Sequence, residues 1–258
     1  MRQGPEKPAD EPVPTLSVRQ ARGDTRAVVL LLHGGKAVSR EVSMSTHLSV
    51  LRMVPFARMI RRRTRREGVA VWRLRYRYRG WNGNEASPVT DARWALDEIR
   101  RRHGHVPVVL LGHSMGGRTA ARVADDPSVC GVVLLAPWLP VGEPVVGVLH
   151  RPVCVLHGDL DRITSARASA DWASRAARSG ADVVMEVVPG GEHFMVRHLR
   201  FWHRRATDAV LRELSACRGV PLASPGPRQD REPGGPAAPG QPRRPSRAAR
   251  SAPTSWTA

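Results

Sequence analysis

Apolar and polar positions divide the chain into short apolar runs separated by longer mixed segments. The apolar runs are rich in Val and Leu, and they predict strands at residues 27–32, 69–76, 107–111, 131–135, 152–156 and 182–188. The segments between them predict helices at residues 46–66, 88–102, 116–125, 165–179 and 195–216, and residues 15–22 predict an additional edge strand. This alternation predicts an α/β fold, a mostly parallel twisted sheet with helices on both faces.

The two ends of the chain lack this pattern. Residues 1–14 carry four prolines and mixed charge, and residues 218–258 carry nine prolines and seven arginines against two acidic residues. Neither segment has enough apolar side chains to offset the entropy lost on ordering. The sequence therefore predicts one α/β domain at residues 15–217 between two disordered segments at 1–14 and 218–258.

One strand is followed by a segment with a reactive pattern, Gly112-His113-Ser114-Met115-Gly116. The pattern G-x-S-x-G suits a strand-to-helix turn that is too sharp for side chains two residues before and after the serine. Such a turn lifts the serine hydroxyl out of the sheet, at the start of a helix. A serine that merely caps a helix needs no glycine on either side, so we interpret Ser114 as a nucleophile.

Three further segments lie just past predicted strands, in an order that matters for catalysis. They are His-Gly-Gly at residues 33–35, His-Gly-Asp-Leu-Asp at 157–161 and Gly-Gly-Glu-His-Phe at 190–194. With the serine segment, they resemble the α/β-hydrolase family over residues 27–214. The likeness is strongest to small capless esterases and to lysophospholipase-like or serine aminopeptidase-like members. Only 16 residues, 136–151, join two of the strands where many members insert a lid, so no cap domain is expected.

The resemblance implies a catalytic triad. Ser114 would be the nucleophile, and His193 would be the base because it lies on a glycine-rich loop after the last strand. The acid would be Asp161, the fourth residue after the histidine of the His-Gly-x-x-Asp pattern. Asp159 is the alternative, although we expect its side chain to bond loop amides, and we expect Glu192 to point to solvent.

An oxyanion hole needs two backbone amides that point at the developing negative charge. One amide is expected from Met115, and the resemblance assigns the other to Gly35, or to Lys36 if the turn is shifted by one residue. Trp81 and Trp138 are candidate pocket walls, and ordinary packing explains either of them equally well.

Charge changes this picture in one region. The formal net charge is +18, and all but two of the 41 basic residues are arginine, a bias that a GC-rich coding sequence would also produce. The stretch that begins at Arg58 and ends at Arg79 holds ten arginines and one acid, Glu67. It is interpreted either as a solvated face or as a surface for peripheral contact with acidic substrates, anionic lipid or nucleic acid, although no nucleic-acid module is recognisable. The same stretch has Arg77 where members of the family often have an aspartate.

The three cysteines Cys130, Cys154 and Cys217 cannot all pair, and we expect inert thiols in a reducing compartment. The first eleven residues are polar and no run of 18 apolar residues occurs, which predicts a cytoplasmic protein.

These features together predict a serine hydrolase that needs no metal or cofactor and cleaves a small carboxylic ester or thioester through an acyl-serine. A peptidase or amidase of the same fold is the first alternative, and an inactive scaffold that binds an acidic partner through its arginine-rich face is the second. Phosphate binding by the glycine-rich turns is disfavoured, since no lysine follows Gly117. The sequence leaves the substrate and the oligomeric state open.

Overall fold

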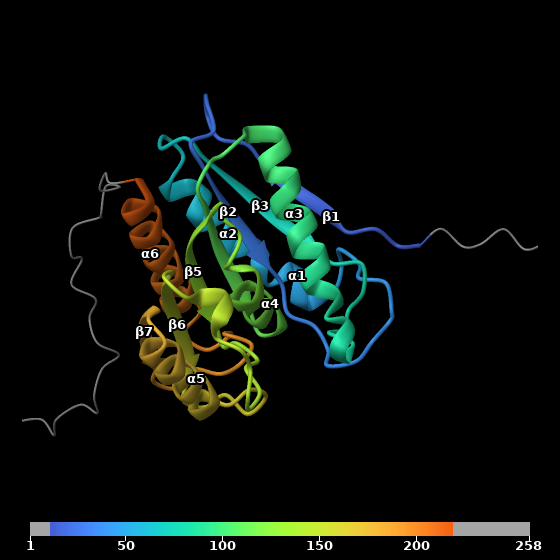
Figure 1. Cartoon of the computed structure of the whole chain (residues 1–258), viewed down its shortest axis with the longest axis vertical. Helices are drawn as coiled ribbons and strands as arrows, with labels where there is room; N and C mark the ends of the chain where they lie inside the picture. The colour runs from blue at the N-terminus through green and yellow to red at the C-terminus, as the bar shows by residue number, and fades with distance from the viewer. Residues whose placement is uncertain (1–10, 219–258) are drawn as a thin grey trace, which may run out of the picture. The chain divides into compact units, whose positions relative to one another are not determined.

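A seven-stranded sheet forms the centre of the protein, whose computed structural model describes residues 11–218 (Figure 1). The strand order is β1-β3-β2-β4-β5-β6-β7, and only β1 runs antiparallel to its neighbour. The strands are β1 (Thr15–Arg19), β2 (Ala27–Leu32), β3 (Val69–Arg75), β4 (Val108–His113), β5 (Val129–Leu135), β6 (Pro152–Gly158) and β7 (Asp182–Val188). The mostly parallel α/β architecture predicted from the apolar runs is confirmed.

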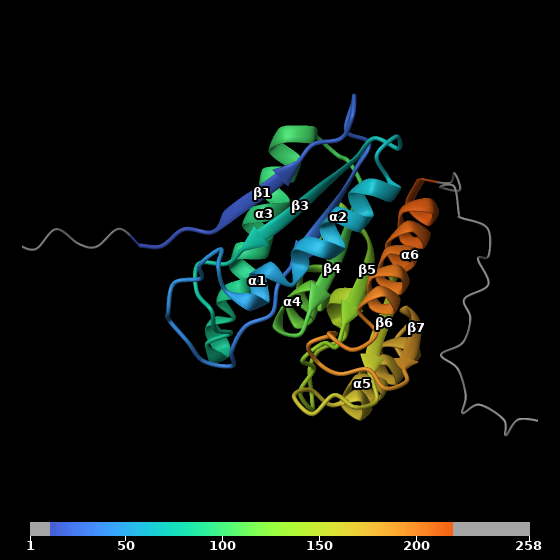
Figure 2. The ribbon, with the colours of Figure 1, turned by 180° about the vertical axis from the view of Figure 1, so that it is seen from behind.

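Helices cover both faces of this sheet, as Figures 1 and 2 show from opposite sides. Helices α2 and α6 pack on one face, and α3, α4 and α5 pack on the other, each face closing its own apolar core. The helices are α1 (Leu48–Leu51), α2 (Met53–Arg63), α3 (Ser87–His103), α4 (Met115–Val123), α5 (Ala166–Arg178) and α6 (Leu199–Arg218). None of the helices within residues 11–218 has the length and hydropathy needed to cross a membrane.

Two predicted helices have different bounds in the structure. The helix predicted at residues 46–66 is divided into α1 and α2 at Arg52. Pro55 has no amide hydrogen to donate to the carbonyl four residues earlier, so a continuous helix loses a hydrogen bond there. The helix predicted to begin at residue 195 begins at Leu199, because Met195 and His198 have φ values of 56° and 57° and keep the preceding segment in a loop.

The connection between β5 and β6 is as short as predicted. Residues 136–151 contain only the 3-10 helix Val146–Val148. No cap domain is inserted at this point, so the carboxyl end of the sheet is shaped by loops alone.

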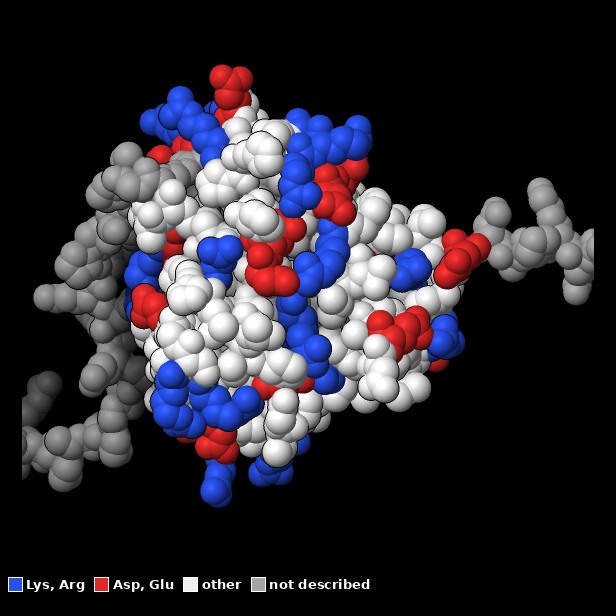
Figure 3. All heavy atoms as spheres, viewed as in Figure 1, with Lys and Arg blue, Asp and Glu red and all other residues white. Residues whose placement is uncertain are grey.

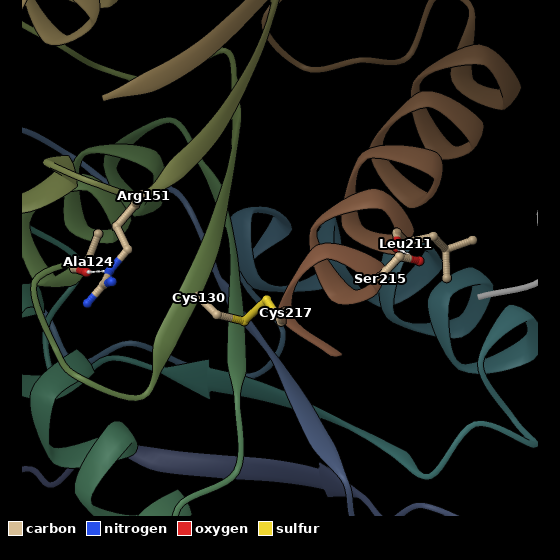
Figure 4. The surroundings of a disulfide bond; sticks show 6 residues. All are labelled: Ala124, Cys130, Arg151, Leu211, Ser215 and Cys217. Carbon is tan, nitrogen blue, oxygen red and sulfur yellow. Dashed lines mark hydrogen bonds between the residues drawn. A yellow bond between two sulfur atoms is a disulfide. The ribbon is translucent and has the colours of Figure 1, made fainter. Parts of the chain in front are cut away.

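The expectation of three free thiols is wrong. A disulfide joins Cys130, at the start of β5, to Cys217, near the end of α6 (Figure 4), and only Cys154 is a buried free thiol. Helix α6 packs on β5, which brings the two Cα atoms to 5.8 Å, within the range that a disulfide spans. An odd number of cysteines excludes complete pairing, but it does not exclude one pair.

The chain divides into two units, Met1–Ser224 and Pro225–Ala258. The second unit and residues 1–10 and 219–224 lie outside the described residues. The domain boundaries and the disorder predicted for residues 1–14 and 218–258 therefore stay predictions.

Candidate active site

Ser114 lies on a sharp turn between β4 and α4. Its backbone has φ 55° and ψ −117°, a conformation that L side chains rarely adopt. A Cβ atom added to Gly112 would lie under 3.0 Å from the Gly116 carbonyl oxygen, and one added to Gly116 would meet the Leu32 carbonyl oxygen equally closely. The glycines are therefore required by the turn. The Ser114 side chain makes no capping hydrogen bond, unlike a serine whose role is to start a helix.

The hydroxyl of Ser114 contacts the imidazole of His193. The Ser114 Oγ atom lies 3.1 Å from His193 Nε2, and the His193 Nδ1–H group donates to Asp161 Oδ2 at 2.8 Å. The three side chains come from the segments that follow β4, β6 and β7, whose carboxyl ends share one edge of the sheet. Three residues that lie far apart in sequence thus form one chain of hydrogen bonds, with the geometry of a nucleophile, a base and an orienting acid.

Asp161 is held in its ionised form by more than His193. Its side chain is fully buried, which on its own would raise the pKa. Hydrogen bonds from His157, His193 and the backbone amides of Thr164 and Ile163 outweigh burial and hold the pKa of Asp161 well below its usual range. A carboxylate that stays ionised fixes the tautomer of His193 and stabilises the imidazolium form.

Three residues at this site were missed by the sequence analysis. His157 Nε2 lies 3.2 Å from Asp161 Oδ2, and the Thr164 hydroxyl lies 2.8 Å from the same oxygen and 3.1 Å from His193 Nδ1. His113, the residue before Ser114, lies with Nε2 3.0 Å from the His193 carbonyl oxygen. Burial lowers the pKa of His113 to about 3, so it is neutral and can donate to this carbonyl without adding charge beside His193. The signal for His157 was present in the sequence, four residues before Asp161.

The two acidic residues set aside in the sequence have different surroundings. Asp159 is exposed, and its carboxylate has no hydrogen-bond partner among residues 11–218. The expectation that it bonds loop amides is wrong, because Asp161 itself accepts from those amides while it contacts the histidines. Glu192 is half-buried rather than directed to solvent, and it accepts from the Arg197 amide.

The loop after β2 lies against the turn that carries Ser114. A Cβ atom on Gly35 would lie under 3.0 Å from the Met115 side chain and from the Arg79 carbonyl oxygen, so only glycine fits there. The Lys36 amide donates to the Arg79 carbonyl at 2.8 Å and is therefore occupied. In the part of the chain that the structure describes, the Gly35 amide has no acceptor, which makes it the better candidate to pair with Met115 in an oxyanion hole.

Comparison with known proteins finds similar folds among serine hydrolases. A family model described as serine aminopeptidase, S33, matches residues 77–151. No curated protein matches the chain in sequence. Among solved structures, a serine hydrolase without a lid from Xanthomonas campestris has a TM-score of 0.57 at 21% identity, and the match covers 82% of this chain and 91% of that one. The chain therefore has the fold of the α/β hydrolases.

Two other solved structures have a similar fold. An α/β serine hydrolase homologue from Coxiella burnetii matches with a TM-score of 0.59 and 16% identity over 76% of this chain and 90% of that one. Esterase 2 of Thermogutta terrifontis, phosphonylated by sarin, matches with a TM-score of 0.61 and 15% identity over 81% and 92%. At these identities the likeness shows the α/β-hydrolase fold.

Two tryptophans lie beside the turn that carries Ser114. The Trp138 amide donates to the Ser114 carbonyl oxygen at 3.0 Å, and the rings of Trp81 and Trp138 meet edge to face at 6.2 Å. The guanidinium of Arg118 lies over both rings and forms an ion pair with the buried carboxylate of Glu143. Trp81 is almost fully buried, which fits ordinary packing, while Trp138 is half-buried and remains a candidate pocket wall.

Arg77 follows β3 at the position where the resemblance predicts an aspartate. Arg77 is held by Asp91 of α3, which accepts from its side chain at 2.6 Å and from its backbone amide at 2.8 Å. Burial raises the pKa of Asp91, and the hydrogen bonds and charge of Arg77 oppose this effect. The departure from the family pattern is thus compensated by an ion pair that fixes the loop leading to Trp81.

Proposed function

We propose that the protein hydrolyses carboxylic esters or thioesters of small molecules through an acyl-serine intermediate. The observation that carries this proposal is the chain of hydrogen bonds from the Ser114 hydroxyl through His193 to Asp161. In the first half of the cycle, His193 Nε2 takes the hydroxyl proton as Ser114 Oγ attacks the carbonyl carbon. The amides of Met115 and Gly35 donate to the oxyanion, and the protonated His193 then gives its proton to the leaving alcohol or thiol.

Water completes the cycle. A water molecule in the place of the leaving group gives a proton to His193 Nε2 and attacks the acyl carbon, and the second tetrahedral intermediate releases the acid and restores Ser114. Asp161 stays ionised throughout, and its role is to orient and stabilise the imidazolium of His193. The absence of a cap between β5 and β6 favours substrates that loops alone can hold.

Known relatives support this reaction class. The Thermogutta terrifontis structure is an esterase with a phosphonyl group derived from sarin, an organophosphorus reagent that reacts with activated nucleophiles. A fluorophosphonate probe is therefore a direct test for an activated serine in this chain, whatever its natural substrate.

The test is labelling of the purified full chain with a fluorophosphonate. Labelling is expected for the wild type and for Ser174→Ala, a control on the exposed side of α5, and it is expected to disappear in Ser114→Ala. His193→Ala and Asp161→Asn should label far more slowly, and Asp161→Asn should lower kcat on an ester by about 10⁴-fold. No labelling of a folded wild type would overturn the enzymatic proposal and favour an inactive scaffold.

Amide hydrolysis is the second candidate, and the match of residues 77–151 to a serine aminopeptidase family model favours it. The two reactions differ in their leaving groups, so a p-nitrophenyl ester and an aminoacyl p-nitroanilide separate them in one assay. Turnover of the ester alone, lost in Ser114→Ala, supports the esterase proposal. Faster turnover of the anilide would replace it with a peptidase or amidase.

The cytoplasmic location stays a prediction. Its argument from reduced thiols no longer holds, since Cys130 and Cys217 are joined.

A further inference from the structure

A hollow lined by arginines lies on the face of the sheet that carries α2, away from the proposed catalytic residues. Its volume is about 820 Å³, within the range of small-molecule sites. Seven arginines line it and no acidic residue does, and we call it the arginine groove. Its arginines are Arg19, Arg22, Arg58, Arg61, Arg62, Arg65 and Arg73.

The fold brings these arginines together from three elements. Arg58, Arg61 and Arg65 recur at the spacing of one helix face along α2 and the turn that follows it. Arg73 lies on β3 opposite Ser17 of β1, and Arg19 is two residues further along β1 on the same face. One helix face and one edge of the sheet thus line a single hollow. Figure 2 shows the ribbons of the three elements, α2, β1 and β3.

These arginines lack the carboxylate partners that the arginines of α3 have. On α3, Arg93, Arg100 and Arg101 each pair with a carboxylate, and blue and red side chains lie next to one another on the face that α3 covers (Figure 3). Within residues 11–218, none of the seven groove arginines has a carboxylate at ion-pair distance. Burial lowers the pKa of Arg73, and the charges of Arg19 and Arg58 lower it further, which shows that these like charges repel.

A smaller hollow adjoins the groove and shares two of its residues. It has a volume of about 440 Å³ and is lined by Arg62, Arg63, Arg65, Arg66 and Glu67. Arg63 is paired with Asp208 of α6. The carboxylates near this end of α2 therefore lie outside the arginine groove, and the groove itself retains its uncompensated charge.

We propose that the arginine groove binds a ligand that carries two or more phosphate groups. The planar guanidinium matches phosphate with paired hydrogen bonds, and several guanidinium groups around one hollow suit more than one phosphate. A bound polyphosphate would offset the repulsion among Arg19, Arg58 and Arg73. The floor of Leu51, Val54, Ala57 and Val69 accommodates the non-polar part of such a ligand. The phosphates come either from a soluble compound or from the head groups of anionic lipids.

The proposal does not depend on the proposed hydrolysis. Neither hollow is lined by Ser114, Asp161 or His193, so binding and catalysis are measured separately. A failed binding experiment leaves the esterase proposal intact, and a failed labelling experiment leaves the groove proposal intact.

The test compares two charge-matched variants of the full chain. Arg58→Gln/Arg61→Gln removes two exposed arginines of the groove, and Arg167→Gln/Arg178→Gln removes two exposed arginines of α5 on the opposite face of the sheet. Glutamine keeps the helix propensity of arginine, and thermal melts confirm that both variants fold. Calorimetry measures the binding of inorganic tripolyphosphate, the soluble phosphate source. Flotation with phosphatidylcholine vesicles, with and without phosphatidylglycerol, measures binding to lipid head groups.

Wild type and the α5 variant are expected to bind alike, and the groove variant is expected to bind about a hundredfold more weakly, about tenfold for each guanidinium lost. Binding of tripolyphosphate alone identifies a soluble ligand, and binding of anionic vesicles alone identifies lipid head groups. An equal loss of affinity in both variants would mean that binding depends only on net charge, which would overturn the proposal. Failure of the wild type to bind either source, or a preference for duplex DNA over both, would overturn it as well.

Discussion

Opening the disulfide between Cys130 and Cys217 is expected to cost the protein a large part of its stability. The bond closes a segment with a sequence separation of 87 residues and ties β5 to the end of α6 (Figure 4). The closed segment includes β6, β7 and the loops that carry Asp161 and His193. Cys217→Ser removes the bond without adding bulk, since serine and cysteine are nearly the same size.

The magnitude follows from the length of the closed segment. The chain-entropy relation for a loop of this length gives about 4.6 kcal/mol at 25 °C, an upper estimate because the unfolded chain retains some structure. Typical domains are stable by about 5–15 kcal/mol in total. For a domain of this size the loss corresponds to a decrease in Tm of roughly 10–18 °C. The native fold is expected to persist, because Trp202, Ala206 and Val210 of α6 still bury their side chains against the sheet.

The assay combines thiol titration with thermal unfolding. The denatured, unreduced wild type should show one reactive thiol, that of Cys154, and the denatured, reduced protein should show three. Reductant should lower the Tm of the wild type to that of Cys217→Ser and should leave the variant unchanged. Three reactive thiols before reduction, or a wild-type Tm that reductant does not change, would refute the reasoning.

Three other substitutions test the site and its support. Gly116→Ala places a Cβ atom under 3.0 Å from the Leu32 carbonyl oxygen, so the rate of ester hydrolysis and the Tm should both fall. Enzyme kinetics and a thermal melt measure these two quantities, and wild-type values for both would contradict the steric argument. Asp161 has a lowered pKa in the folded protein and an unfolded value of about 3.9, so its contribution to stability is complete above about pH 5 and is lost progressively as the pH falls from there toward the folded value. Urea unfolding at pH 7 and pH 3 should therefore show a smaller loss of stability in Asp161→Asn than in the wild type, and equal losses would exclude this linkage. Glu143→Gln leaves the partly buried Arg118 without its counter-charge and should cost roughly 3–5 kcal/mol in urea unfolding, whereas a loss below about 1 kcal/mol would mean that water solvates the guanidinium.

The sequence predicts the sheet well, because its central strands are buried on both faces. β2 is Ala-Val-Val-Leu-Leu-Leu with every residue buried, and such a run has few alternatives to a central parallel strand. The triad geometry also follows the sequence closely. Gly112 is required by its contact with the Gly116 carbonyl, within the same five residues, although Gly116 is required by the distant Leu32 carbonyl. The segments that carry Asp161 and His193 each follow a strand that its own apolar run predicts.

Contacts between distant segments could not be predicted in this way. The pairing of Cys130 with Cys217 depends on how α6 packs on β5, and nothing near either cysteine records that packing. The contact of His157 with Asp161 depends on a loop that folds back on itself, although the spacing of four residues was visible. The division between α1 and α2 was predictable, because Pro55 interrupts the hydrogen bonding of any helix that continues through it.

The abundance of arginine and its placement have separate explanations. A coding bias raises the number of arginines everywhere, and it accounts for a net charge of +18 without reference to any ligand. It does not select where carboxylates lie, and on α3 the acidic residues Asp97 and Glu98 have been placed within reach of the arginines that follow them. Glutamate residues in α2 would neutralise its arginines in the same way. They would relieve the repulsion at Arg58 and Arg61 at no cost in helix propensity. Coding bias therefore leaves the unneutralised charge of the arginine groove unexplained, and a phosphate-bearing ligand supplies the missing counter-charge.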